Sequence, residues 1–277
     1  MTERYTAYTL VDSSFYPFGS RSISMDGDRH GETPRSFKWS VHRQPGTIFY
    51  TDIRLSEVKH YSNTLEIALL IEPSWKPSPY ETAQRLSNAF DYILSYRDNY
   101  FNTVNHLWYP FGGSWIKDED WGIKEKSKQL SIIGTQKLAA PGHKLRHTAI
   151  RLYGDRLDVY GRGYNPIPSK IPALAPYRYS VVIEPQRLDS YFTEKLIDCF
   201  SQGTIPLYWG TRKITNFFDE RGMIILDNIT DIYNHLPELT PSYYNACLPY
   251  IRANLEAARA YQCAEDWIYS RYPHLFT

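Results

Sequence analysis

Hydrophobic residues recur along the chain in short runs rich in β-branched and aromatic side chains, and stretches with helical periodicity lie between several of them. Eight such runs, most of them ending at Gly, Pro, Asp or Glu, cover residues 48–53, 66–72, 90–96, 130–134, 157–161, 179–184, 205–210 and 223–227. Short β-type runs that alternate with helical patterns are typical of parallel βαβ units. The pattern therefore predicts an α/β protein.

The clearest helical pattern covers residues 190–201, where apolar side chains recur three or four positions apart. Ser190 is the expected N-cap of this helix and Gly203 its expected end. Further helices are expected over residues 142–153 and 241–269, and a break of the latter near Pro249 stays open. Residues 20–47 are polar and rich in Arg, Gly, Pro and Ser, which favours a long loop.

A length of 277 residues, at roughly 150 residues per domain, suggests two domains, although one large α/β domain would also fit. The glycine-containing, charged stretch at 110–128 is interpreted as their junction. We therefore expect an N-terminal domain over residues 1–120 and a C-terminal domain over 121–277, whose last helix could pack back on the first domain. A weak echo between residues 70–73 and 182–185 fits two similar halves.

Composition excludes several classes of protein. With 42% hydrophobic and 22% charged residues the chain is not disordered, and its net charge of +1 provides no basic field for nucleic acid. No apolar run approaches the roughly 20 residues of a membrane span, and the first thirty residues lack the apolar core of a signal peptide. Three cysteines without paired spacing argue against a disulfide framework, so a cytoplasmic location is expected. The 24 tyrosines suit sugar surfaces, and equally suit a core.

The common catalytic and nucleotide-binding signatures are missing from the sequence. It contains no P-loop, no Gly-x-Ser-x-Gly elbow and no His-Glu-x-x-His motif. Asp118, Glu119 and Asp120 have the acidic spacing that holds a divalent metal against a nucleotide diphosphate in one class of glycosyltransferase. Because Lys117 and Lys124 flank this run, a solvated charge cluster is the preferred interpretation, and no metal site is expected.

The most informative segment starts with a predicted strand that ends at Glu184 and continues into the predicted helix, with Tyr191, Glu194 and Lys195 near its start. A helix N-terminus favours a phosphate, and Lys195 adds a positive charge there. Glu194 can accept hydrogen bonds from ribose or sugar hydroxyls. The set therefore suits a nucleotide-sugar, while a simpler interpretation, in which Glu194 and Lys195 only solvate the helix start, stays open.

Three pieces of this segment, at residues 183–185, 191–195 and 203–210, occur in the order and spacing of a known donor-binding motif. Their sequences are Ile-Glu-Pro, Tyr-Phe-Thr-Glu-Lys and Gly-Thr-Ile-Pro-Leu-Tyr-Trp-Gly. The segment resembles that of the α-1,3/1,4-fucosyltransferases, glycosyltransferase family 10. Upstream of this motif the family has a strand, a loop and an arginine that opens a helix. Residues 130–135 followed by 144–147 resemble that arrangement, which makes Arg146 the candidate that binds the donor diphosphate.

The resemblance implies a GT-B architecture, in which two Rossmann-like α/β domains face each other across a cleft. It also implies an inverting, metal-independent transfer of fucose from GDP-fucose to a glycan hydroxyl, with no cofactor beyond the nucleotide-sugar. The implied donor-binding residues are Arg146, Glu184, Tyr191, Glu194 and Lys195. The membrane anchor of the Golgi members is absent, so the resemblance implies a soluble microbial or viral version in the cytosol of a microbe or an infected host cell.

The general base is implied less directly. Glu72, followed by Pro73 and by the strand at residues 90–94, resembles the family's arrangement of a strand-end glutamate ahead of an Asp-Tyr strand. An inverting transfer needs one carboxylate to take the proton of the acceptor hydroxyl. Glu72 is therefore the candidate base, and Glu66 and Glu81 are its nearby substitutes.

One departure from the family pattern bears on the donor. Pro185 stands where the family has an asparagine that touches the donor, and proline cannot make that side-chain hydrogen bond. Another donor, such as a UDP- or GDP-linked pentose, therefore stays open beside GDP-fucose. A non-catalytic carbohydrate-binding protein and an inactive scaffold also fit the sequence, and nucleotide binding separates the enzyme from a lectin.

Overall fold

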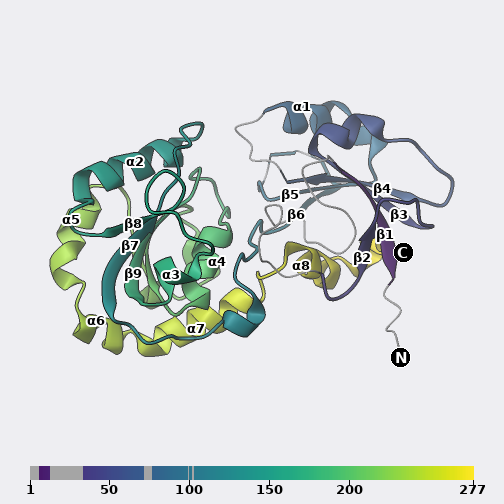
Figure 1. Cartoon of the computed structure of the whole chain (residues 1–277). Helices are drawn as coiled ribbons and strands as arrows, with labels where there is room; N and C mark the ends of the chain where they lie inside the picture. The colour runs from purple at the N-terminus through teal and green to yellow at the C-terminus, as the bar shows by residue number, and fades with distance from the viewer. Residues whose placement is uncertain (1–5, 13–33, 72–76, 99, 102) are drawn as a thin grey trace. The chain divides into compact units, whose positions relative to one another are not determined.

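The chain divides into two compact units (Figure 1). The computed structural model describes residues 6–12, 34–71, 77–98, 100–101 and 103–277. Unit 1 consists of residues 1–111 and 263–277, and unit 2 consists of residues 112–262. The sequence-based boundary between residues 120 and 121 instead falls inside unit 2, because Ile116 and Trp121 are both buried in a core cluster of that unit.

Unit 1 is built on a parallel sheet. Its strands are β1 (Ala7–Val11), β2 (Lys38–Ser40), β3 (Thr47–Thr51), β4 (Leu65–Leu70), β5 (Tyr92–Ser95) and β6 (His106–Trp108), in the spatial order β2-β1-β3-β4-β5-β6. Helix α1 (Pro77–Arg85) precedes β5. Helix α8 (Ala264–Arg271), from the far end of the chain, contributes Ala264 and Ile268 to the core beside Tyr8 and Trp39.

Unit 2 holds a second parallel sheet with the spatial order β11-β10-β9-β7-β8. Its strands are β7 (Lys128–Ile133), β8 (Asp158–Tyr160), β9 (Tyr177–Ile183), β10 (Ile205–Trp209) and β11 (Ile224–Ile225). From β7 the chain passes to β8 on one side, whereas from β9 it passes to β10 on the other. The strand order therefore reverses between β7 and β9, and ligands of open α/β sheets bind at the carboxyl ends of strands at such a switch point.

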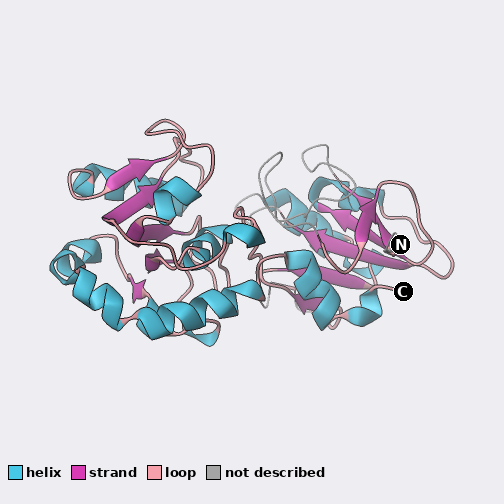
Figure 2. Ribbon diagram, turned by 60° about the horizontal axis from the view of Figure 1, so that its bottom comes forward, coloured by secondary structure: helices cyan, strands magenta, loops and turns pink. Residues whose placement is uncertain are grey.

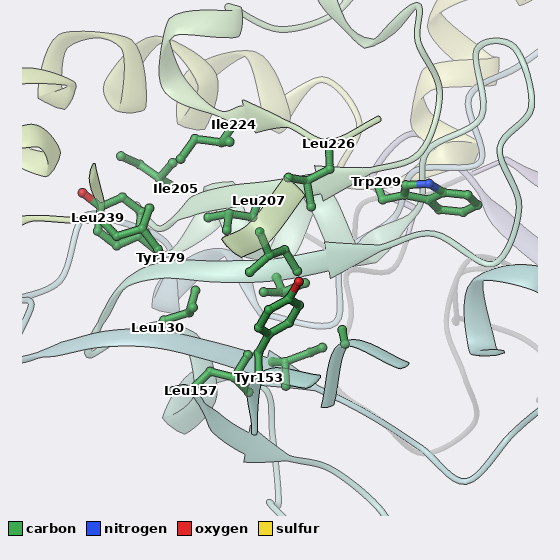
Figure 3. Packing of buried hydrophobic residues seen from close by; sticks show 14 of the residues in the cluster. Leu130, Tyr153, Leu157, Tyr179, Ile205, Leu207, Trp209, Ile224, Leu226 and Leu239 are labelled. Atoms are coloured by element: carbon green, nitrogen blue, oxygen red, sulfur yellow. The ribbon is translucent and has the colours of Figure 1, made fainter. Parts of the chain in front are cut away.

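Helices cover both faces of this sheet (Figure 2). They are α2 (Pro141–Tyr153), α3 (Ile171–Leu174), α4 (Glu194–Ser201), α5 (Asp231–His235), α6 (Pro241–Ala246) and α7 (Leu248–Arg259). Along β9 and β10 alternate side chains turn to opposite faces: Tyr179 and Leu207 join the cluster drawn in Figure 3, whereas Val182 and Tyr208 pack with α4. Both faces are thus buried, which explains why these strands read as continuous apolar runs.

The structure confirms the predicted parallel α/β architecture and adds elements that the pattern did not reveal. Strands β1, β2 and β6 and helix α1 were not expected, and β2 lies inside the stretch expected as a long loop. The helix expected over residues 241–269 is three helices, α6, α7 and α8, and Cys247 separates the first two. None of the helices in the described parts of the chain is long and apolar enough to cross a bilayer.

Candidate functional site

Four of the five predicted donor-binding residues gather at the switch point of unit 2, where α2 and α4 begin beside the carboxyl ends of β7 and β9; they are Arg146, Glu184, Glu194 and Lys195. The backbone N–H of Gly142, in the first turn of α2, donates to the carbonyl oxygen of Pro185 at 2.9 Å. A Cβ atom at Gly142 would lie 1.8 Å from the carbonyl oxygen of Glu184. Only glycine therefore lets α2 start directly against the end of β9.

Glu184 connects the end of β9 to the start of α4. Its carboxylate is fully buried and accepts two hydrogen bonds from Thr193, from the backbone N–H at 2.9 Å and from the hydroxyl at 2.6 Å. Burial raises the pKa of Glu184, and the positive charge of Lys195 and the bonds from Thr193 act in the opposite direction. Thr193 is the N-cap of α4, in place of the expected Ser190, whose backbone adopts a positive φ of 54°.

Glu194 lies between two ammonium groups. The Lys195 ammonium is 3.0 Å from its Oε1 atom, and the Lys170 ammonium is 3.3 Å from the same atom. Burial alone would raise the pKa of Glu194, but Lys195 and Lys170 together lower it to about 2. Glu194 is therefore an anion at every physiological pH and pairs with both cations. It is buried, so it does not merely solvate the start of α4.

Arg146 is buried on α2, and its side chain lies at the end of β9, near Glu184 and Glu194. Its guanidinium donates to the carbonyl oxygen of Ile183 at 2.7 Å, at the last residue of β9. Burial lowers the pKa of Arg146, whereas Glu184 and Glu194 raise it. The structure thus brings Arg146 within electrostatic range of two of the other predicted residues.

Two residues near Arg146 were not expected from the sequence. His143, on the first turn of α2, accepts at Nδ1 from the backbone N–H of Ala140 at 3.2 Å. Burial and the neighbouring Arg146 lower the pKa of His143 to about 4, so its ring is neutral at pH 7. Half-buried Tyr164 places its hydroxyl 2.8 Å from Nδ1 of His147, also on α2. Nothing in the local pattern marks either residue, because contacts across the fold bring them here.

The other residues that the sequence suggested, one for donor binding and three as the general base, do not join this group of charged side chains in the structure described. Tyr191 is buried, with 2% of its surface exposed, so its ring lies in the interior of unit 2. Glu72, the candidate base, lies outside the described residues. Of its substitutes, Glu66 is buried near the amino end of β4, away from the edge where ligands bind, and Glu81 is exposed on α1.

The acidic run at residues 118–120 forms a single turn in which Glu119 is exposed and the two aspartates are half-buried. Asp118 is engaged by Arg259, whose guanidinium lies 2.7 Å from its carboxylate, and Glu119 lies 3.9 Å from the ammonium of Lys117. Within the described part of the chain, no group of three or more His, Cys, Asp and Glu side chains is arranged to hold a metal ion. Two carboxylates of the run are thus engaged in ion pairs with Arg259 and Lys117.

Comparison with known proteins bears on the fold of the chain. No protein-family model matches the chain. A segment of 72 residues is 32% identical to the alpha-(1,3)-fucosyltransferase FucT of Helicobacter pylori, and it covers 26% of this chain and 14% of that protein. The chain thus spans only a small part of the length of this relative.

Several solved structures match nearly the whole chain, among them the following two. An α1,3-fucosyltransferase in complex with GDP aligns with a TM-score of 0.54 and 14% identity, over 94% of this chain and 90% of that one. TarM aligns with a TM-score of 0.57 and 12% identity, over 96% of this chain and 65% of its own. With its two parallel-sheet α/β units, the chain therefore has the predicted GT-B fold, and its fold is similar to that of the α1,3-fucosyltransferase.

Proposed function

We propose that the chain is an inverting, metal-independent glycosyltransferase that moves a sugar from a nucleotide diphosphate to a glycan hydroxyl. Fucose from GDP-fucose is the expected donor, and a fucosyltransferase of the same fold has been solved with GDP-fucose. One observation carries the proposal: the starts of α2 and α4 meet the end of β9 at the switch point, so that Arg146 and Lys195 both interact with Glu184 there.

The donor diphosphate is expected to bind to side chains more than to helix N–H groups. The N–H of Thr193 is already bonded to Glu184, and that of Lys195 points to the Thr193 hydroxyl at 3.4 Å. Lys195 is the more exposed member of its ion pair with Glu194, with 28% of its side chain accessible against 8%. Lys195 and Arg146 therefore supply the charge that stabilises the leaving diphosphate.

The reaction breaks the bond between the anomeric carbon and the diphosphate oxygen while the acceptor oxygen attacks from the opposite face. The acceptor hydroxyl loses its proton to a carboxylate, a role we assign to Glu72. A well-placed base of this kind contributes roughly 10²- to 10⁴-fold in rate.

A second donor remains a candidate because of Pro185. Its side chain offers no hydrogen-bonding group, and its carbonyl oxygen is bonded to Gly142. A UDP- or GDP-linked pentose is therefore tested beside GDP-fucose. We also propose a cytoplasmic location, which is supported by three cysteines that are all buried and unpaired.

The proposal is tested by thermal unfolding in the presence of GDP, UDP, CMP, dTDP and their sugars, with and without EDTA. A nucleotide at about 100 times its dissociation constant should stabilise the protein by roughly 2.7 kcal/mol. A shift with GDP that persists in EDTA supports the fucosyltransferase, whereas a shift with UDP alone changes the donor. The absence of a shift with every nucleotide would refute the proposal and favour a carbohydrate-binding protein.

Substitution of Lys195 tests the assignment of the site. Lys195→Ala removes a charge-assisted contact to the diphosphate, so the dissociation constant for the nucleotide should rise at least about tenfold. Lys128→Ala is the matched control, because Lys128 is a partly exposed lysine at the amino end of β7, at the opposite edge of the same sheet. Equal affinities in both variants would remove Lys195 from the donor site.

A further inference from the structure

Lys170, a residue that no sequence motif marks, lies buried beneath the start of α4. Only 11% of its side chain is exposed, and its ammonium lies 2.5 Å from Oδ2 of Asp198 and 3.3 Å from Oε1 of Glu194. The ring of Trp115 covers it at 4.1 Å. A buried ammonium enclosed by two carboxylates and an aromatic face is a fixed charge.

Asp198, the stronger partner of Lys170, is itself held in place. Its Oδ1 atom accepts from the hydroxyl of Ser114 at 2.7 Å and from the backbone N–H of Trp115 at 2.9 Å. The carboxylate therefore cannot turn toward another cation without leaving these two donors buried and unpaired. Asp198 thus ties the segment before β7 to the middle of α4, and Lys170 pairs with this fixed carboxylate.

The charges around α4 balance. Three carboxylates, Glu184, Glu194 and Asp198, interact with three cations, Arg146, Lys170 and Lys195. Of the two lysines, Lys170 contacts two carboxylates and is nearly inaccessible, whereas Lys195 contacts one and is partly exposed. Only Lys195 can leave its partner for an incoming anion at little cost.

We propose that Lys170 is a positioning residue of the donor site, an inference that rests on the proposed function. Its ammonium contacts both Glu194 and Asp198, so that Lys195 is not the sole cation beside Glu194 and can turn to the donor diphosphate. Without Lys170, one uncompensated negative charge would lie beside the diphosphate, and Lys195 would be kept by Glu194.

The loss of Lys170 should make the affinity for a nucleotide decrease as the pH rises. Glu194 and Asp198 face Lys170, Lys195, Arg146 and Glu184, together with the neutral thiol of Cys199 on α4. When Lys170 is absent, uptake of one proton by this group restores the balance, and burial already raises the pKa of Asp198 and of Glu184. The variant therefore binds an anion well at low pH and poorly at high pH.

The experiment measures the dissociation constant for GDP between about pH 5.5 and pH 8.5 in the unsubstituted protein and in Lys170→Met. The ratio of the two constants removes the titration of GDP itself. We expect this ratio to rise with pH, from below about threefold to above about tenfold. Lys170→Arg keeps the charge and should give a ratio near one at each pH.

Lys126→Met is the matched control. Lys126 is also a mostly buried lysine of unit 2, but its ammonium donates to neutral oxygens, those of Ala175 at 2.9 Å, Gln202 at 2.7 Å and Thr204 at 3.0 Å. Its loss should lower stability. Burial lowers the pKa of Lys126 to about 7, so its charge is already lost from the unsubstituted protein at high pH, and any ratio in Lys126→Met should fall and not rise with pH. If Lys170→Met does not fold, the double variant Lys170→Met/Asp198→Asn restores the charge balance and should bind GDP with a ratio independent of pH.

The outcomes separate the two proposals. A flat ratio in Lys170→Met, or the same pH dependence in Lys126→Met, would overturn the role of Lys170 while leaving the proposed function in place. Absence of binding by any nucleotide diphosphate to the unsubstituted protein would overturn both.

Discussion

The carboxylate of Glu184 is the structural link between β9 and α4, and its removal tests the geometry of the site. Glu184→Leu keeps a side chain of similar size but deletes the acceptor of both Thr193 bonds, at 2.9 Å and 2.6 Å. A hydrogen bond to a charged group contributes about 1.5–3 kcal/mol, and the lost desolvation penalty of the carboxylate offsets part of the sum. We expect a net loss of about 3 kcal/mol in the free energy of unfolding of unit 2, or roughly 6–12 °C in Tm.

Urea unfolding followed by tryptophan fluorescence measures this loss. Glu125→Leu is the control, since Glu125 is exposed in the same unit and its replacement should change stability by less than about 0.5 kcal/mol. Thr193→Val and the double variant complete a cycle, in which the double variant should lose at least about 1 kcal/mol less than the two single losses together. A Glu184→Leu variant within about 1 kcal/mol of the parent, or strict additivity in the cycle, would show that the link does not hold α4 in place.

Two further predictions concern the same site. Gly142→Ala should displace the start of α2, since its Cβ would lie 1.8 Å from the carbonyl oxygen of Glu184, and we expect a loss of about 1–3 kcal/mol together with weaker GDP binding; unchanged stability and affinity would show that α2 need not pack this closely. Because the pKa of Glu194 is lowered from 4.5 to about 2 in the folded protein, the unfolded chain binds the extra proton first, and the stabilisation is lost as the pH falls from about 4.5 to about 2. Glu194→Gln should lack this part of the acid dependence in urea unfolding, and an identical slope in both proteins would contradict the assigned pKa.

The segment at residues 177–210 could be interpreted from its sequence because its structure is locally encoded. Apolar residues fill β9 and β10, and helical periodicity with Gly203 as the stop signal predicts α4. The start of α4 was misplaced at Ser190, since the N-cap depends on Thr193 being held by Glu184, a contact across nine positions of the chain. Capping residues alone do not resolve such a choice.

Other elements form only through contacts with residues far away in the sequence, and the hydrophobic pattern along the chain does not predict them. β2 and β6 have three residues each and become strands only by pairing with β1 and β5. The last fifteen residues return to unit 1, a possibility that the sequence left open for the last helix, and there Ile268 and Leu275 complete a core begun by Tyr8. Periodicity over a few residues carries no information about such pairings.

The sequence by itself determined the parallel α/β class and the motif that contains Glu184, Glu194 and Lys195, because strand and helix periodicity and motif spacing are properties of neighbouring residues. Only the tertiary structure decided what these residues do. It made Glu184 a buried acceptor for Thr193, set Arg146 against the end of β9, and brought Lys170 and Asp198 to Glu194. Burial and charge pairing act through space, so the balance of ionised groups that leaves Lys195 accessible follows from the fold and not from the order of residues.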